Sequence, residues 1–324
     1  MGVAGTIRGL IPRAARRLNP LLSDEYDTAH HSYHLIDGSM PKFTESAIQR
    51  FAGLEAFPQP PTIPLTHPVV LMHGFGIMAA FQRGGHLHQE AMYLRERGVR
   101  AYAPNVAPYN SIPVRAGMWK ERIEHILGET GAARLVLIAH SMGGLDARYL
   151  ITKLGLHDQV SALVTVSTPH RGTAIADSVL NQPDLVREWL ASVADYIGAR
   201  ALRDSPSDAL RAVSELTPDH MQAAFNPGVP DHPDVRYWSY AGQAGRGTDI
   251  PLDPFFYVLN SIVYKQEGIN DGYVSVESAK WGSFLGTIDA DHARQIGIRS
   301  SLGADFDSNG FYANVARMLA DEGL

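Results

Sequence analysis

The stretch "RLVLIAHSMGGLDARYL" (134–150) decides the fold expected for this chain, because it joins an apolar strand to a helix through one serine. Ala139 precedes Ser141 by two positions and Gly143 follows it by two. A tight strand-to-helix turn has room only for small side chains at these positions, and such a turn is called a nucleophile elbow. The usual pattern is G-x-S-x-G, from which this chain departs with alanine. The elbow would expose Ser141 at the carboxyl edge of a parallel sheet, where ligands bind. The alternative is a serine that only caps the following helix.

Strands and helices alternate on both sides of this stretch. The strands are apolar on both faces, which is typical of a parallel sheet covered by helices on its two sides. Helical spacing predicts helices at 86–98, 113–131 and 142–155, and apolar runs predict strands at 68–76, 99–105, 134–141, 161–170, 234–242 and 271–279. The predicted class is therefore α/β, with a mostly parallel central sheet.

Residues 174–234 interrupt this alternation with helical segments. We interpret them as a helical insertion, a lid or cap, within one domain that covers residues 61–324. Residues 1–60 read as an N-terminal extension. Its first 22 residues contain four arginines and no acid, which suits either a basic arm that touches a membrane surface or a solvated extension. Two prolines limit any helix there to about two turns, which favours the solvated extension.

Composition excludes several classes of protein. The net charge is −6 and no long basic block occurs, which argues against a nucleic-acid partner. No run of ~18 apolar residues predicts a membrane span. The chain has 0 cysteines, so disulfides and thiol chemistry are excluded. Without a clear signal peptide these features favour the cytoplasm, and they leave secretion open.

A serine hydroxyl needs a base and an acid to become a nucleophile, and in this type of fold they follow it in the order acid, histidine. Asp271 lies in an Asn-Asp-Gly turn and His292 lies beyond the last expected strand. Of the 14 histidines, His292 is the one that we assign as the base. The residues alone leave Asp289 and Asp291 as rivals to Asp271, which could also be an ordinary turn residue. His292 could likewise only start a helix.

Acyl transfer also needs donors for an oxyanion. One would be the backbone N–H of Met142, which follows the serine, and the other the N–H of Phe75 in the glycine loop "HGFG" (73–76). The side chains of both residues can line an acyl pocket. The apolar residues Phe255, Phe256 and Tyr257 are further candidates for this lining, and core packing is the alternative for them.

Together these segments resemble the bacterial triacylglycerol lipases of the Pseudomonas and Burkholderia type, which have the α/β-hydrolase fold. The motifs span about 68–298 and comprise "VVLMHGFG", "AHSMGG", "VSTPHRGT", "RYWSYAG" and "NDGYVSVESAKWG…DHARQIG". The resemblance implies Ser141 as nucleophile, Asp271 as acid and His292 as base, with oxyanion donors at Phe75 and Met142. It also implies a lid in the helical insertion that opens at a lipid surface.

The resemblance further implies a structural Ca²⁺ between two aspartates, one of which matches Asp253. The second position is Arg294, and a guanidinium cannot coordinate a cation that prefers oxygen ligands. We therefore expect no cofactor and no metal, and an Asp253–Arg294 ion pair in place of the calcium. The alternative is that Arg294 points to solvent.

The sequence thus predicts a serine carboxylester hydrolase, a lipase or esterase, that acts on ester or lipid substrates through an acyl-enzyme. A polyester or polyhydroxyalkanoate depolymerase, or an acyltransferase, would use the same three residues. A catalytically silent hydrolase fold that serves as a binding module is disfavoured, because all three catalytic positions are filled.

Overall fold

The computed structural model describes residues 51–52, 60–76, 85–181, 209–298 and 306–324. It divides the chain into two units, Met1–Gln59 and Pro60–Leu324, and every element below belongs to the second. The predicted basic arm (1–22) lies outside the described residues.

Six parallel strands form one sheet in the order β2-β1-β3-β4-β5-β6. The strands are β1 (Val69–Met72), β2 (Ala101–Tyr102), β3 (Leu135–His140), β4 (Val160–Val166), β5 (Arg236–Gly242) and β6 (Ser283–Ile288). The main helices are α3 (His88–Arg95), α4 (Ile112–Thr130), α5 (Gly143–Thr152), α11 (Tyr257–Glu267) and α13 (Ser308–Asp321). Shorter helices and turns are η3 (Leu156–Asp158), α6 (Ala174–Leu180), α8 (Ala209–Ser214), α9 (Pro218–His220), η4 (Met221–Phe225), α10 (Asn226–Gly228), η5 (Pro254–Phe256), α12 (Val276–Ala279) and η6 (Arg294–Ile296).

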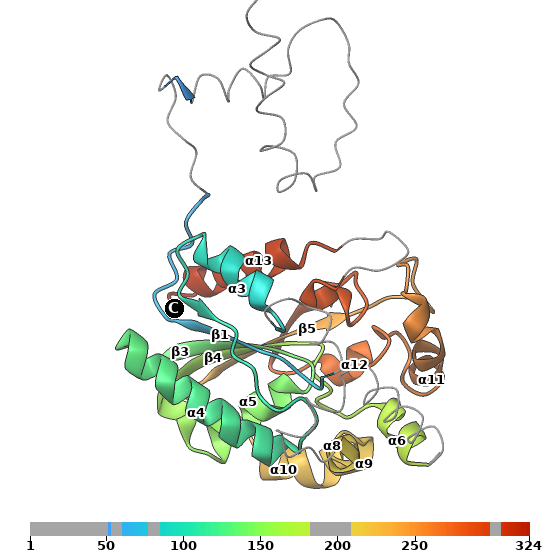
Figure 1. Ribbon diagram of the computed structural model, residues 1–324. Coiled ribbons are helices and arrows are strands. Elements are labelled where there is room, and N and C mark those ends of the chain that lie inside the picture. The colour runs from blue at the N-terminus through green and yellow to red at the C-terminus, as the bar shows by residue number, and fades with distance from the viewer. Residues whose placement is uncertain (1–50, 53–59, 77–84, 182–208, 299–305) are drawn as a thin grey trace, which may run out of the picture. The chain divides into compact units, whose positions relative to one another are not determined.

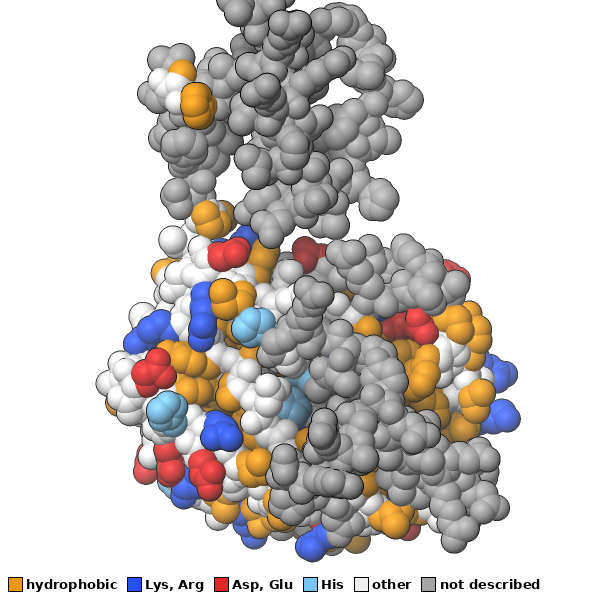
Figure 2. Space-filling model, in the orientation of Figure 1, with side chains coloured by type: hydrophobic (Ala, Val, Ile, Leu, Met, Phe, Trp, Pro, Cys, Tyr) orange, Lys and Arg blue, Asp and Glu red, His pale blue; other side chains and the backbone are white. Residues whose placement is uncertain are grey.

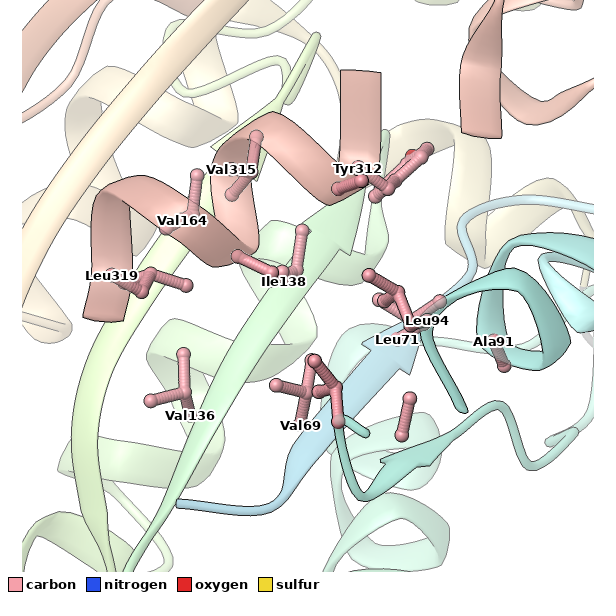
Figure 3. Packing of buried hydrophobic residues seen from close by; sticks show 14 of the residues in the cluster. Val69, Leu71, Ala91, Leu94, Val136, Ile138, Val164, Tyr312, Val315 and Leu319 are labelled. Atoms are coloured by element: carbon pink, nitrogen blue, oxygen red, sulfur yellow. The ribbon is translucent and has the colours of Figure 1, made fainter. Parts of the chain in front are cut away.

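Helices cover both faces of the sheet, α3 and α13 on one side and α4 and α5 on the other (Figure 1). Successive strand residues point to opposite faces, so Val69 and Leu71 pack in the first layer while Val70 and Met72 pack in the second. In the first layer, side chains of α13 lie over the central strands (Figure 3). Because both faces are buried, the central strands β3 and β4 are mostly apolar, and the α/β class predicted from the sequence is confirmed.

Two helices end where glycine predicts. Gly131 caps α4 in a left-handed conformation with φ of 64°, and Gly155, with φ of 73°, lies just beyond α5. A residue without a side chain adopts this conformation at little cost.

The strand expected at 271–279 is wrong. The structure has a turn there, followed by α12, and the last strand of the sheet is β6. Asp271 accepts hydrogen bonds from the backbone N–H groups of Tyr273 and Val274. Ser275 accepts one from the backbone N–H of Ser278. These side chains bind the local backbone and so compete with sheet pairing, although the alternating polar and apolar residues imitate a strand.

Helical segments occupy the predicted insertion, since α6, α8, α9 and α10 lie within 174–234. Residues 182–208, the centre of the expected lid, lie outside the described residues. No described helix is both long enough and apolar enough to cross a membrane. On the face seen in Figure 2, cationic and anionic side chains are interspersed among apolar ones.

Candidate active site

Ser141 stands in the turn between β3 and α5 with a φ of 57°, a region that non-glycine residues rarely adopt. Neighbouring strands hold this conformation. The backbone N–H of Ser141 donates to the carbonyl of Val166 over 2.9 Å, and the hydroxyl of Thr168 donates to the carbonyl of Ser141 over 2.7 Å. The turn therefore presents the serine hydroxyl in a strained but firmly held geometry, as an elbow requires.

The small residues after Ser141 are demanded by close packing. A Cβ on Gly143 would lie 2.7 Å from the carbonyl oxygen of His73 and 2.9 Å from that of Met72. A Cβ on Gly144 would lie 2.2 Å from the hydroxyl oxygen of Thr168. The elbow thus packs against the end of β1 and the loop after β4, which leaves no volume for larger side chains.

The structure brings Ser141, His292 and Asp271 together. The Nε2 atom of His292 lies 2.9 Å from the Oγ of Ser141, and its Nδ1 atom lies 2.7 Å from the Oδ2 of Asp271. A carboxylate only accepts hydrogen bonds, so Nδ1 carries the proton and Nε2 can accept one from the serine hydroxyl. This is the geometry of a nucleophile, a general base and the acid that orients it.

Asp271 is completely buried, and its other oxygen, Oδ1, accepts hydrogen bonds from the backbone N–H groups of Tyr273 at 3.0 Å and Val274 at 2.9 Å. Burial by itself raises the pKa of this carboxyl group. The charge of His292 and the hydrogen bonds outweigh that effect, so the pKa of Asp271 is lowered. The group is therefore ionised at neutral pH.

The two rival acids lie elsewhere. Asp289 is exposed and accepts a hydrogen bond from Gln243 over 2.8 Å. Asp291 is buried and pairs with Arg294 over 2.9 Å. Among the three aspartates weighed from the sequence, Asp271 is the one bonded to His292.

A second histidine lies against the base. The rings of His140, at the end of β3, and His292 are 4.4 Å apart between centroids. Burial, and then the charge of His292, lowers the pKa of His140 well below its ordinary value, so His140 is neutral and does not compete as a base.

The loop after β1 approaches the nucleophile so closely that only glycine fits. A Cβ on Gly74 would lie 2.9 Å from the Oγ of Ser141 and 2.9 Å from the backbone nitrogen of Met142. Glycine therefore keeps open the space between the nucleophile and this N–H group, where an oxyanion would sit. Phe75 follows in the same loop and lines the adjoining pocket. The assignment of Phe75 and Met142 as donors stays a prediction.

A buried ion pair that we did not foresee ties this loop to α5. The guanidinium of Arg115 donates to Asp146 over 2.9 Å and to the carbonyl oxygen of His73 over 2.8 Å, and both charged side chains have 0% exposure. Burial raises the pKa of Asp146 to about 6, although Arg115 acts to lower it. The sequence carried a signal, since Arg115 shares the buried face of α4 with Ile112 and Trp119.

An almost wholly apolar pocket opens beside Ser141 and His292. Its lining comes from the loops around the site and from α6, α8 and α11, and comprises Phe75, Pro169, Thr173, Ile175, Ala176, Val179, Val213, Leu216, Leu259, Tyr273 and Val274. Of these residues the sequence indicated Phe75 alone, because it does not reveal which helices of an insertion meet over a site.

The other expected lining residues lie apart from this pocket. Phe255 and Tyr257 are 58% and 52% exposed, and Phe256 is buried against Tyr273 with ring centroids 5.3 Å apart. Phe256 therefore matches the alternative of core packing.

The residues around Arg294 do not suit Ca²⁺. The guanidinium of Arg294 pairs with Asp291 and donates to the carbonyl of Pro251, and the backbone N–H of Asp253 donates to Asp291 over 3.3 Å. A cation there would meet a positive charge where it needs oxygen ligands. Arg294, Asp291 and Asp253 thus already connect the loop around His292 to the segment before η5 and α11. The direct Asp253–Arg294 pair stays a prediction.

A parallel sheet with a strained serine elbow and its histidine and acid at the carboxyl edge defines the α/β-hydrolase class. Residues 115–202 match the family model "PGAP1-like alpha/beta domain". The chain is 32% identical over 223 residues to triacylglycerol lipase 2 of Saccharomyces cerevisiae, a match that covers 66% of this chain and 63% of that protein. It thus spans less than two thirds of the length of the yeast protein.

A second relative, the triacylglycerol lipase of Vibrio cholerae, is 27% identical over 242 residues, which cover 68% of this chain and 75% of that protein. Among solved structures, the lipase of Staphylococcus hyicus superposes with a TM-score of 0.61 at 20% identity, covering 83% of this chain and 99% of that one. These findings confirm the resemblance stated from the sequence and the α/β-hydrolase fold of the chain.

Proposed function

We propose that this protein hydrolyses carboxylic esters that carry apolar acyl groups, with Ser141 as the nucleophile. The observation that carries the proposal is the continuous contact from Ser141 through His292 to Asp271 beside an apolar pocket. The relatives named as triacylglycerol lipases support the same class of reaction.

In the proposed reaction the Oγ of Ser141 attacks the ester carbonyl carbon while Nε2 of His292 takes the hydroxyl proton. Asp271 holds the imidazole in its tautomer and stabilises the imidazolium. The N–H groups of Met142 and Phe75 bind the negatively charged oxygen of the tetrahedral intermediate. The intermediate collapses, and the alcohol leaves with the proton from His292. Water, activated by the same histidine, then hydrolyses the acyl-enzyme. These groups complete the reaction without a cofactor.

The substrate class that fits best is a lipid ester. The pocket offers an acyl chain apolar walls from α6, α8 and α11. Contact with a lipid interface through the helical insertion (174–234) belongs to this proposal.

The test is hydrolysis of a series of p-nitrophenyl esters, from acetate to palmitate, by the native protein and by Ser141→Ala. We expect the variant to lose at least about 10⁴-fold in kcat. A matched control is Ser161→Ala near the amino end of β4, at the edge of the sheet away from the site. This variant should leave kcat unchanged. A maximum at long chains favours a lipase and one at short chains an esterase. Full activity in Ser141→Ala, or none in the native protein on any ester, refutes the proposal.

A further inference from the structure

We propose that Gln295 is a positioning residue for the catalytic acid, in that its side-chain amide shares Oδ2 of Asp271 with His292 and fixes that carboxylate. The inference rests on the proposed ester hydrolysis and extends the site by one residue.

The amide nitrogen of Gln295 has two acceptors. Nε2 donates to Oδ2 of Asp271 over 3.0 Å and to the carbonyl oxygen of Ala290 over 3.2 Å. Because both partners only accept, the nitrogen and not the oxygen of the amide must face them. The side chain has 0% exposure, so water does not replace it. Both N–H bonds of the amide are thus committed, and its orientation is fixed.

With this contact, both oxygens of Asp271 are saturated. Oδ1 accepts two backbone N–H groups, and Oδ2 accepts one N–H from His292 and one from Gln295. A carboxylate held on all sides cannot rotate away from the imidazole. Gln295 lies in η6, three positions after His292. One turn of the chain therefore supplies both the base and the second donor to Oδ2 of Asp271.

The end of β5 is shaped to receive this amide. A Cβ on Gly242 would lie 1.9 Å from Nε2 of Gln295 and 2.8 Å from Cβ of Asp271. The φ of Gly242 is not in the left-handed region, so its backbone conformation does not call for glycine. The absence of a side chain is needed here for space, and the occupant of that space is the amide of Gln295.

The shared oxygen predicts an electrostatic role. Gln295 and the imidazolium that forms during catalysis both draw on the negative charge of Oδ2. Removing the amide donor leaves more of that charge to His292, which then holds its proton more strongly. The other groups that face His292 are Ser141 from the elbow, His140 from β3 and Tyr273 from the acid loop, with Asp291 and Arg294 beside it in the chain.

The test compares two variants of nearly native volume. Gln295→Leu removes the donor, and Gln295→Glu replaces it by a carboxyl group. For both we would measure kcat and KM on a soluble p-nitrophenyl ester from pH 5 to 9, normalised to the Ser141 sites that react with a fluorophosphonate.

For Gln295→Leu we expect kcat to fall about tenfold with KM nearly unchanged, because a hydrogen bond to a charged group is lost. The acidic limb of kcat/KM moves to higher pH, so kcat/KM relative to the native protein rises with pH to a plateau. In Gln295→Glu the two adjacent carboxyl groups share one proton at low pH. The introduced group donates to Asp271 there and loses that proton on raising the pH, so its relative activity falls with pH.

The matched control is Gln243→Leu, which removes a glutamine–aspartate hydrogen bond of the same kind from Asp289 on the same loop. This variant should change neither kcat nor the position of the acidic limb in the pH profile of kcat/KM. Equal losses of kcat in both Gln295 variants at every pH would mean a purely structural role and overturn the inference. A native kcat together with a native acidic limb of kcat/KM in Gln295→Leu would overturn it too. Should Gln295→Leu fail to fold, the test rests on Gln295→Glu alone, whose activity relative to the native protein must fall as the pH rises. A native protein that hydrolyses no ester instead refutes the proposed function.

Discussion

The nucleophile side and the acid–base side of the site hold their catalytic groups by different means. Around Ser141 the backbone does so, through a positive φ and through Gly143, which packs against carbonyl groups of β1 and its loop. Around Asp271 and His292 the side chains hold one another, through the bonds on Oδ2. The first side should therefore be sensitive to added volume, and the second to a change of charge or of donors at constant volume.

The largest effect is expected from Asp271→Asn, which keeps the volume and changes the charge. The asparagine amide has only one acceptor oxygen, and if the backbone N–H groups of the acid loop keep it, the NH2 group faces His292 and Gln295. The variant then favours the wrong tautomer of the imidazole, so kcat should fall by about 10⁴. Steady-state kinetics on a p-nitrophenyl ester measures the loss. Asp289→Asn is the control, since that carboxylate is exposed and bonded to Gln243. A loss below tenfold in Asp271→Asn would contradict the expected sensitivity of this side to charge and donors.

Adding one methyl group at Gly74 tests the nucleophile side. Its Cβ would enter the space between Oγ of Ser141 and the N–H of Met142, so we expect kcat to fall by about 10² to 10³, as on loss of an oxyanion donor. The control is Gly117→Ala in α4, whose Cβ would meet nothing within 4 Å and which should stabilise the fold by about 0.5–1 kcal/mol. Native kcat in Gly74→Ala would remove this glycine from the oxyanion site.

The pocket adjoins both sides of the site, and here a change of side-chain volume should alter substrate selectivity. Val179→Trp fills the pocket from α6, so the ratio of long-chain to short-chain ester hydrolysis should fall about tenfold. Phe255→Ala changes a residue that is 58% exposed and should leave that ratio as it is. If instead Phe255→Ala shifts the ratio and Val179→Trp does not, the acyl chain lies along η5, outside this pocket.

The last prediction concerns the stability of the fold against pH and leaves activity aside. Burial lowers the pKa of His73, His86, His140 and His170, that of His86 to about 4. Below pH 6.5 these histidines bind protons in the unfolded chain but not in the folded protein. The free energy of unfolding therefore falls as the pH drops. Each such histidine contributes about 1.4 kcal/mol per pH unit, for His86 until about pH 4.

Chemical denaturation between pH 7 and 5 measures this slope. We expect His86→Asn to lower the slope by the equivalent of one bound proton. His88→Asn, at an exposed position of α3, should leave the slope unchanged. A slope that His86→Asn does not alter would mean that His86 is protonated in the folded protein.

Side chains that act on the adjacent backbone could be identified from the sequence. The elbow is one such case, because the need for small residues beside Ser141 is a local steric rule. Local rules also misled us at 271–279, where the turn and cap formed by Asp271 and Ser275 imitate a strand by composition.

The amino-acid sequence by itself determined the alternation of strands and helices, the elbow and the order serine, acid, histidine, because these depend on neighbours a few residues apart. Only the tertiary structure decided which aspartate meets His292, that Arg115 pairs with Asp146, that Gln295 reaches Asp271, and which helices enclose the pocket. Such contacts join side chains from different elements. Their distances follow from how the sheet and its helices pack, and no spacing along the chain encodes that packing.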